Sequence, residues 1–374
     1  MNPSYIGIGF DSYRPWNRGV LQGVTRYARE HADWHLVLPG LATKEMTFFQ
    51  ELAERVDGWI VDRPYVSLPG DLPQVAITPE GHDRFRAAVI SDMEAIGALA
   101  AEAFFAAGYR QAACLEIVPG AHPPDDERDA GFRRRAEELG MPVEPVPSPL
   151  IQGRADVSKA LIVRLRCLVK PVGLFAHNLN EVHALSFFIA EASLQVPNEI
   201  GLIVGGDDRT GLEALIPSVS GIDRNMSQIG WQAARQLHRL LRGEAVERVI
   251  RVPPLGVVAR ESTELDRHED VVIRKAVQFI RNSLLEPLPM SRIAAAAHVS
   301  ESSLHRRFRR VLGYTPAEEV RRQRLRRALK LLRETHLPLA DVSERCGYAE
   351  SSQLSRAVKG ETGMTPKGFR QATR

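Results

Sequence analysis

Residues 299–310, VSESSLHRRFRR, could bind a polyanion, because arginine and histidine side chains are concentrated in this short stretch. Leu304, Phe308 and Val311 recur at intervals of four and three, which predicts a helix with these side chains facing a core. Hydroxyl, imidazole and guanidinium groups on the opposite face could bond to phosphates and to base edges of DNA. A solvated basic face is the simpler interpretation of one such run. The polar face carries Ser302, His305, Arg306 and Arg309.

The surrounding residues have the spacing of a helix-turn-helix. In MSRIAAAAHVSESSLHRRFRRVLG (290–313), a short helix is followed by a break at 298–300 and then by a second helix. Ser300 is a suitable N-cap for this second helix, and Gly313 is a suitable end for it. The sequence therefore predicts that 301–312 is a recognition helix.

The same plan returns in LADVSERCGYAESSQLSRAVKGETG (339–363). A short helix reaches Cys346, a turn follows at Gly347, and a second helix begins 50 residues after the first recognition helix. One helix-turn-helix pattern is a weak signal, but two in register predict a DNA-binding domain. The polar side chains of the second recognition helix are Ser351, Ser352, Ser355, Arg356 and Lys359.

The connecting residues 315–334, TPAEEVRRQRLRRALKLLRE, predict one rigid helix, because they contain no internal Gly or Pro. Twenty helical residues span about 30 Å, and one turn of B-DNA spans about 34 Å. Such a helix could place two recognition helices in successive major grooves on one face of the duplex. Its apolar stripe is formed by Leu325, Ala328, Leu329 and Leu332.

Residues 272–374 resemble the DNA-binding domain of the AraC-type regulators, through GYTPAEEVRRQRLRRALKLL and GMTPKGFR, which match its two Gly-x-x-Pro stretches. Leu354 and Val358 replace Phe residues that are common in the family's second recognition helix. We expect Arg306 to pair with a guanine edge, and Arg310 and Arg321 to contact phosphates. The resemblance implies base contacts by Ser302, His305, Arg306, Ser351, Ser352, Ser355 and Arg356.

The charge of the chain divides at the same place. Residues 271–374 hold 21 Lys and Arg against 9 Asp and Glu, a net charge of +12, whereas residues 1–270 have 28 against 37, a net charge of −9. This asymmetry predicts an anionic partner for the C-terminal part. The three cysteines form no metal-binding cluster, and no signal peptide or long apolar run is present. We therefore expect a cytoplasmic protein without a metal or a membrane partner.

The N-terminal part alternates short apolar runs with amphipathic helices. This alternation predicts parallel sheets covered by helices, an α/β class. The expected strands lie at 5–10, 56–62, 73–78, 111–118, 171–177 and 200–206, and the expected helices at 17–31, 92–109, 128–140 and 179–194.

In open parallel sheets, ligands bind beyond the carboxyl ends of the strands. Carboxylates, amides and arginines there suit a ligand covered in hydroxyls, and Trp16 could cover the apolar face of a sugar ring. Helix capping is the simpler interpretation of Asp11, Asn178 and Asp207 taken singly. The polar residues that follow the expected strands are Asp11, Ser12, Asp62, Arg63, Thr78, His177, Asn178, Asp207 and Asp208.

This part resembles the ligand-binding domain of the LacI/GalR-type sugar regulators, a two-lobed type I periplasmic-binding-protein fold. The resemblance is carried by 91–115, 127–140, 194–208 and 217–244. It implies that Arg128, Asn178 and Asp207 hold sugar hydroxyls. Asn178 departs from the Asp usual in that family, and PPDDERDAGF places extra acid beside Arg128. Those regulators carry DNA-binding helices at the N-terminus, whereas here the first strand begins at residue 5.

No GxSxG, HExxH, Walker A or GxGxxG motif occurs, and the acidic pair of VGGDD would repel a phosphate. We therefore expect neither an enzyme nor a bound cofactor.

A LacI-type sugar-binding domain, here called the sensor, ahead of an AraC-type DNA-binding domain, here called the reader, resembles the xylose-operon regulators of bacteria. We expect a sugar sensor at 1–262, a linker at 263–271 and a double helix-turn-helix domain at 272–374. The resemblance implies a homodimer that binds operator DNA and D-xylose. Another pentose, a hexose or a purine as effector stays open, as does a sugar-binding module without a regulatory role.

Overall fold

The computed structural model describes residues 4–11, 14–38, 55–62, 72–79, 82–116, 123–149, 155–265, 270–284 and 288–372. Two of the candidates named above, Ser12 and Arg63, lie outside these residues. The chain forms two compact units, Met1–Leu265 and Asp266–Arg374. Among the described residues, no helix is long and apolar enough to cross a bilayer.

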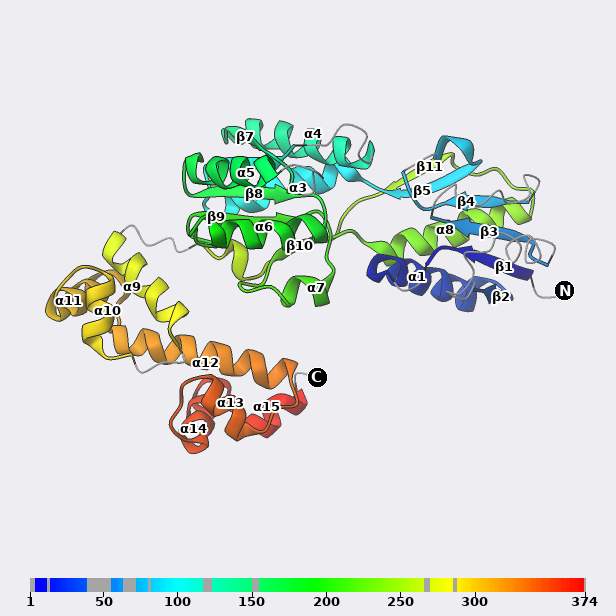
Figure 1. Cartoon of the computed structure of the whole chain (residues 1–374). Helices are drawn as coiled ribbons and strands as arrows, with labels where there is room; N and C mark the ends of the chain where they lie inside the picture. The colour runs from blue at the N-terminus through cyan, green and yellow to red at the C-terminus, as the bar shows by residue number, and fades with distance from the viewer. Residues whose placement is uncertain are drawn as a thin grey trace. The chain divides into compact units, whose positions relative to one another are not determined.

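The first unit contains two six-stranded sheets (Figure 1). The sheet of lobe 1 has the order β11-β5-β4-β3-β1-β2, and every neighbouring pair is parallel. Helices α1 (Pro15–His31) and α8 (Met226–Leu241) pack against each other, and α8 covers this sheet. Its strands are β1 (Ser4–Gly9), β2 (Trp34–Val37), β3 (Gly58–Val61), β4 (Gln74–Ala76), β5 (Ala87–Ser91) and β11 (Val249–Val252).

The sheet of lobe 2 has the order β12-β10-β9-β8-β6-β7, with only the edge strand β12 antiparallel to its neighbour among the described strands. Its strands are β6 (Gln111–Leu115), β7 (Val143–Val146), β8 (Val172–Ala176), β9 (Ile200–Val204), β10 (Ser220–Asp223) and β12 (Gly256–Val258). Its helices are α3 (Met93–Ala107), α4 (Pro123–Glu138), α5 (Ala155–Cys167), α6 (Leu179–Glu191) and α7 (Arg209–Glu213).

The chain crosses between the two sheets three times, after β5, after β10 and after β11. Strands β5, β8 and β9 are buried along their whole length, as expected for parallel strands covered on both faces. Two short 3₁₀ helices, η1 (His82–Arg84) and η2 (Glu261–Thr263), complete this unit.

The second unit is helical and has two small cores (Figure 1). Helix α12 joins them, because Val320 belongs to the first core and Ala328 and Leu332 belong to the second. The helices are α9 (Val271–Asn282), α10 (Met290–Ala296), α11 (Glu301–Leu312), α12 (Pro316–Glu334), α13 (Leu339–Arg345), α14 (Ser351–Thr362) and α15 (Pro366–Ala372). The predicted fold class, a two-lobed α/β domain followed by a double helix-turn-helix, is confirmed.

The connecting helix forms as predicted. Thr315 accepts a hydrogen bond from the Glu318 backbone N–H, and the Glu318 carboxylate accepts one from the Thr315 N–H, a reciprocal capping box. Pro316 occupies the first turn, where no backbone hydrogen bond is lost. The helix then runs unbroken for 19 residues, about 28 Å at the α-helical rise.

One core residue was predicted wrongly. Leu304 and Phe308 are fully buried, but Val311 is 40% exposed. The apolar stripe of α11 instead continues in steps of four to Leu312, which packs against the first core. Gly313 ends the helix in the left-handed conformation directly afterwards.

Candidate functional sites

Arg128 is a deeply buried arginine of the candidate sensor site. It lies on α4, is 7% exposed, and its Nη1 donates to the His177 carbonyl at 2.6 Å. Burial, reinforced by the nearby charge of Arg224, lowers the pKa of Arg128 to about 9, so the guanidinium stays charged at neutral pH. A Cβ at Gly205 would lie 2.9 Å from Nη1, so glycine at this position makes room for the side chain.

Arg224 joins the two lobes, and it is not among the residues predicted from the sequence. It follows β10 in the crossing toward α8, and its Nε and Nη2 donate to Ser91 Oγ at 3.3 and 3.1 Å. Ser91 ends β5, at another of the crossings. Burial lowers the pKa of Arg224 to about 10, while the charge of Asp62 acts in the opposite direction. Both arginines therefore lie near one another with a carboxylate beside them.

The polar groups that follow β3 and β8 are buried near these arginines. Asp62 follows β3, and His177 follows β8. The Glu181 carboxylate accepts the His177 backbone N–H at 2.8 Å and lies 3.4 Å from its Nδ1. Burial alone would raise the pKa of Glu181, but these contacts with His177 outweigh it and lower the pKa. Charge and hydrogen-bonding groups from both lobes thus face one region.

The capping interpretation holds for Asn178 and fails for Asp207. Asn178 Oδ1 accepts from the Glu181 backbone N–H at 3.1 Å at the start of α6. The cap of α7 is Asp208, which accepts from the Gly211 N–H at 3.3 Å. Asp207 Oδ1 instead lies 2.7 Å from Nη2 of Arg260, a residue far along the chain. Asp207 is therefore available for a role other than capping.

The remaining sensor candidates lie at the start of α1. Asp11 is exposed, and its carboxylate is 3.9 Å from Arg14 Nε. It does not cap the helix, because Arg14 holds the N-cap position without a side-chain hydrogen bond. Asn17 donates to the Asp11 carbonyl at 2.7 Å, and Trp16 is half-buried beside it. Ligand contacts by Asp11 and Trp16 stay predictions.

In the second unit, α11 and α14 present matching faces at a spacing of 50 residues. Leu304 and Phe308 of α11 correspond to Leu354 and Val358 of α14, and all four are fully buried. The two apolar replacements in α14 therefore fill the core position. Of the predicted DNA-contacting residues on these faces, Ser351 and Ser355 are half-buried, and the exposed ones are Ser302, His305, Arg306, Arg309, Ser352, Arg356 and Lys359.

Three of the residues predicted to contact DNA already make contacts within the protein. Ser352 donates to the Glu350 carboxylate at 2.8 Å, and Arg309 donates to the Gly313 carbonyl at 3.4 Å. Arg310 is exposed, but its Nη2 lies 3.7 Å from the carboxylate of Asp270, which competes with a phosphate for its charge. Arg321 is exposed on α12. All remain candidates.

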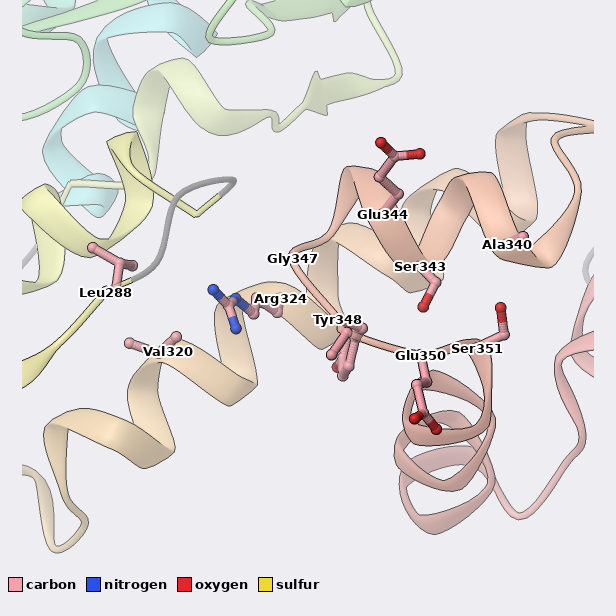
Figure 2. A pocket seen from close by; sticks show the side chains of 11 residues that line it. Leu288, Val320, Arg324, Ala340, Ser343, Glu344, Gly347, Tyr348, Glu350 and Ser351 are labelled. Carbon is pink, nitrogen blue, oxygen red and sulfur yellow. The ribbon is translucent and has the colours of Figure 1, made fainter.

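The turn of the second helix-turn-helix lies close to Leu284, which belongs to the first core of this unit. Figure 2 shows Arg324 of α12 beside the Gly347–Tyr348 turn, in a groove of about 860 Å³ lined by α12, α13 and the start of α14. Arg324 Nε donates to the Leu284 carbonyl, at the end of the first core, at 3.3 Å. Gly347 has φ +71°, and a Cβ there would lie 2.6 Å from the same carbonyl oxygen. This contact holds the turn of the second motif against the end of the first core.

We therefore expect Gly347→Ala to destabilise the reader more than Gly313→Ala. Both glycines have positive φ, +71° and +78°, but a Cβ at Gly313 would meet nothing within 4 Å. Gly313→Ala should lower the free energy of unfolding by about 1–2 kcal/mol, because alanine is strained in the left-handed conformation. Gly347→Ala should lower it further, because its Cβ would also clash with the Leu284 carbonyl oxygen. Urea unfolding of both full-length variants measures the difference. Equal losses would show that the Leu284 contact is unimportant.

Comparisons with known proteins agree with this architecture. Residues 293–372 match the model of a helix-turn-helix domain, and residues 101–263 match that of a periplasmic binding protein-like domain. The xylose operon regulatory protein of Haemophilus influenzae is 24% identical over 98% of this chain and 97% of its own length. The xylose operon regulatory protein of Escherichia coli K12 is 31% identical over 47% of this chain and 46% of its own length.

Solved structures show the same fold. The structure of the xylose-binding transcription activator xylR covers 99% of this chain and 98% of its own, with a TM-score of 0.82 and 22% identity. A LacI family transcriptional regulator from Mycobacterium smegmatis covers 69% of this chain, with a TM-score of 0.52 and 19% identity. The first match thus extends over both units, and the second is shorter by about the length of one unit.

Proposed function

We propose that the chain is a sugar-responsive, DNA-binding transcription regulator. It is similar to the xylose operon regulatory protein of Haemophilus influenzae over nearly its whole length, and it joins a periplasmic binding protein-like domain to a helix-turn-helix domain. The observation that carries this proposal is the pairing of two helix-turn-helix motifs on one unbroken helix, on the same chain as a two-lobed α/β unit. The proposed role needs no catalysis and places the protein in the cytoplasm, with DNA.

D-xylose is the effector that we propose. Arginines, carboxylates and a histidine from both lobes suit a small ligand covered in hydroxyls. The relatives' names support a pentose. Arg128 and Asp207 from lobe 2, and Asp62 from lobe 1, are the proposed contacts, and Arg224 and Ser91 join them at the crossings. Another pentose, a hexose or a purine is the alternative effector.

Binding would act through a shift between open and closed lobes. A sugar that touches Asp62 of one lobe and Arg128 of the other makes all its contacts only when the lobes are closed. Closure then changes how tightly the reader binds a repeated operator. We propose that α11 and α14 of each reader enter successive major grooves, with Arg310 and Arg321 on phosphates.

A thermal-shift screen of the full chain tests the effector. A ligand at a hundred times its Kd stabilises the state that binds it by about 2.7 kcal/mol. We expect D-xylose to give the largest shift among pentoses, hexoses and purines. A larger thermal shift with a purine would support the alternative effector. If the chain bound a sugar but no DNA duplex, it would be a sugar-binding module without a regulatory role.

Arg306→Ala should relax base preference at one position of the operator, at a cost of about 1–3 kcal/mol. Arg306 is exposed on the polar face of α11, where its guanidinium can pair with a guanine edge. Arg310→Ala is the matched control: loss of a phosphate contact should weaken all sequences alike and reduce the salt slope by about one. Affinities for an operator and its single-base variants distinguish the two patterns. An unchanged base preference in Arg306→Ala would exclude the assigned role.

We also propose a homodimer. Phe187 on α6 is 61% exposed and Val163 on α5 is 59% exposed, so the outer helices of lobe 2 offer apolar side chains to a second copy. Sedimentation equilibrium of the full chain tests this proposal, and a monomer at micromolar concentration would contradict it.

A further inference from the structure

An ion pair bridges the two lobes of the first unit beside the sensor site. Arg251 lies on β11, an edge strand of the lobe 1 sheet, and Glu127 lies on α4 of lobe 2. Nη1 and Nη2 of Arg251 donate to the two carboxylate oxygens of Glu127 at 2.8 and 3.2 Å, a bidentate arrangement. Each side chain is 43% exposed, so salt in the solvent can screen the pair.

The charges around this pair are complementary across the two lobes. The hydrogen bond from Arg251 outweighs burial and lowers the pKa of Glu127, and the charge of His82, on η1 of lobe 1, acts in the same direction. The hydrogen bond to Glu127 raises the pKa of Arg251, and the charges of Asp92 and Glu94, at the start of α3, add to this effect. Basic groups of lobe 1 thus face carboxylates of lobe 2.

Glu127 is attached rigidly to the rest of lobe 2. It directly precedes Arg128, which we propose as an effector contact. Helices α3 and α4 pack in backbone contact, because a Cβ at Gly97 would collide with the Arg128 carbonyl and a Cβ at Gly131 with the Glu94 carbonyl. The start of α4 therefore cannot shift without α3, and a pull on Glu127 moves these two helices together.

Arg251 is held equally well on the side of lobe 1. Strand β11 pairs in parallel with β5, with Arg251 opposite Ile90. The Val252 carbonyl accepts the Asp92 N–H at 2.9 Å, where the chain leaves β5 for lobe 2. The pair therefore lies close to the crossings about which the lobes must rotate. A fixed distance between two groups near such a hinge limits the angle that the lobes can adopt.

The arrangement of the lobes that allows this pair also brings the proposed effector contacts together. The charge of Asp62 in lobe 1 acts on Arg224 at a crossing, and the charge of Arg224 acts on Arg128 in lobe 2. An effector that contacts both Asp62 and Arg128 selects this arrangement over one with separated lobes. Separation of the lobes would break the pair of Arg251 with Glu127.

We propose that Arg251 and Glu127 form a latch that favours the effector-binding arrangement of the lobes and thereby raises the affinity for the effector. Both are positioning residues, since they act through the angle between the lobes. Exposed ion pairs usually change an equilibrium by about fivefold at most, so the latch is weak enough to open. The inference rests on the proposed sugar-responsive function and adds a determinant of effector affinity.

The salt dependence of sugar binding isolates the latch, because D-xylose carries no charge. Isothermal titration of the full chain at about 0.01 M and about 1 M salt compares screening lengths of about 30 and 3 Å. Buried pairs such as Asp207 with Arg260 are screened much less. We expect the affinity of the wild type to fall by about two- to fivefold at high salt. Arg251→Gln should bind D-xylose at both salt concentrations about as weakly as the wild type does at high salt.

Two further variants show whether the loss belongs to the pair. Arg251→Gln combined with Glu127→Gln should bind no more weakly than either single variant, because both remove the same interaction. Arg135→Gln is the matched control, since it breaks a similarly exposed pair with Glu102 inside lobe 2 and should keep the wild-type affinity and salt response. Wild-type affinity or salt response in Arg251→Gln, or additive losses in the double variant, would overturn the proposal.

A second measurement needs no effector. Spin labels at Gln22→Cys on α1 and Ala190→Cys on α6, in a chain with the exposed Cys167 replaced by Cys167→Ser, report the distance between the lobes. At low salt, Arg251→Gln should shift the distance distribution in the direction in which high salt shifts the wild type. An unchanged distribution would overturn the inference whatever the effector is. A chain that shows this shift but ignores D-xylose would instead reject D-xylose as effector and leave the latch supported.

Discussion

Arg327→Pro is expected to lower operator affinity by about a hundredfold or more. Two linked binding elements bind about this much more tightly than one element alone. Arg327 is exposed in the middle of α12, so its replacement removes no core packing. Proline there removes a backbone hydrogen bond and clashes with the preceding turn, which kinks or breaks a helix at a cost of about 3 kcal/mol or more. Once α12 is bent, only one recognition helix can reach its groove.

Arg327→Ala is the control for the lost charge, because alanine keeps the helix intact. Fluorescence anisotropy with a labelled operator measures both variants. Each half of the reader has its own core, so circular dichroism should show most of the helix content retained in the proline variant. Equal affinities of the proline and alanine variants would show that the helix does not set the spacing.

Asp207→Asn is expected to weaken D-xylose binding by about 10- to 150-fold, the equivalent of one hydrogen bond to a charged group. Asparagine is preferred to alanine here, because its amide oxygen can still accept a hydrogen bond from the buried Arg260 guanidinium, whereas alanine leaves no acceptor. Operator affinity without sugar should stay within about threefold of wild type. This change is smaller than the roughly 5- to 150-fold by which an effector usually alters the affinity at a second site. The sugar response of the operator complex should move to about 10- to 150-fold higher concentrations of D-xylose.

Asp208→Asn is the matched control, since it changes the neighbouring carboxylate and retains a good cap for α7. Isothermal titration of both variants with D-xylose gives the affinities. If Asp208→Asn lost as much affinity as Asp207→Asn, the assignment of Asp207 as the ligand-binding carboxylate would be wrong.

The reader could be predicted from the sequence nearly in full, because its signals are local. Ser300 and Thr315 cap helices, Gly313 and Gly363 end them, and the apolar stripe at Leu304 and Phe308 repeats 50 residues later. Each signal depends on residues within one or two turns. The wrong assignment of Val311 arose because steps of three and of four from Phe308 both reach an apolar residue, and only Leu312 packs against the core.

The sensor site could be predicted only in part. Asp62, Asn178 and Asp207 follow strands with strong apolar runs, so the rule for parallel sheets found them. Ser91 ends β5 and Arg224 follows β10, and neither strand is among those expected from the sequence. The run SGID contains one large apolar residue, and the run AAVIS is apolar but only five residues long. Arg260 reaches Asp207 across 53 residues of sequence, a tertiary contact that no local pattern indicates.

The spacing of the contacts on DNA tests the reader geometry most directly. Methylation protection of guanines in an operator bound by the full chain should reveal, for each reader, two protected major-groove segments about 10 base pairs apart, on one face of the duplex. Protection of a single segment per reader, or of two segments on opposite faces, would contradict a rigid α12 that aligns α11 and α14.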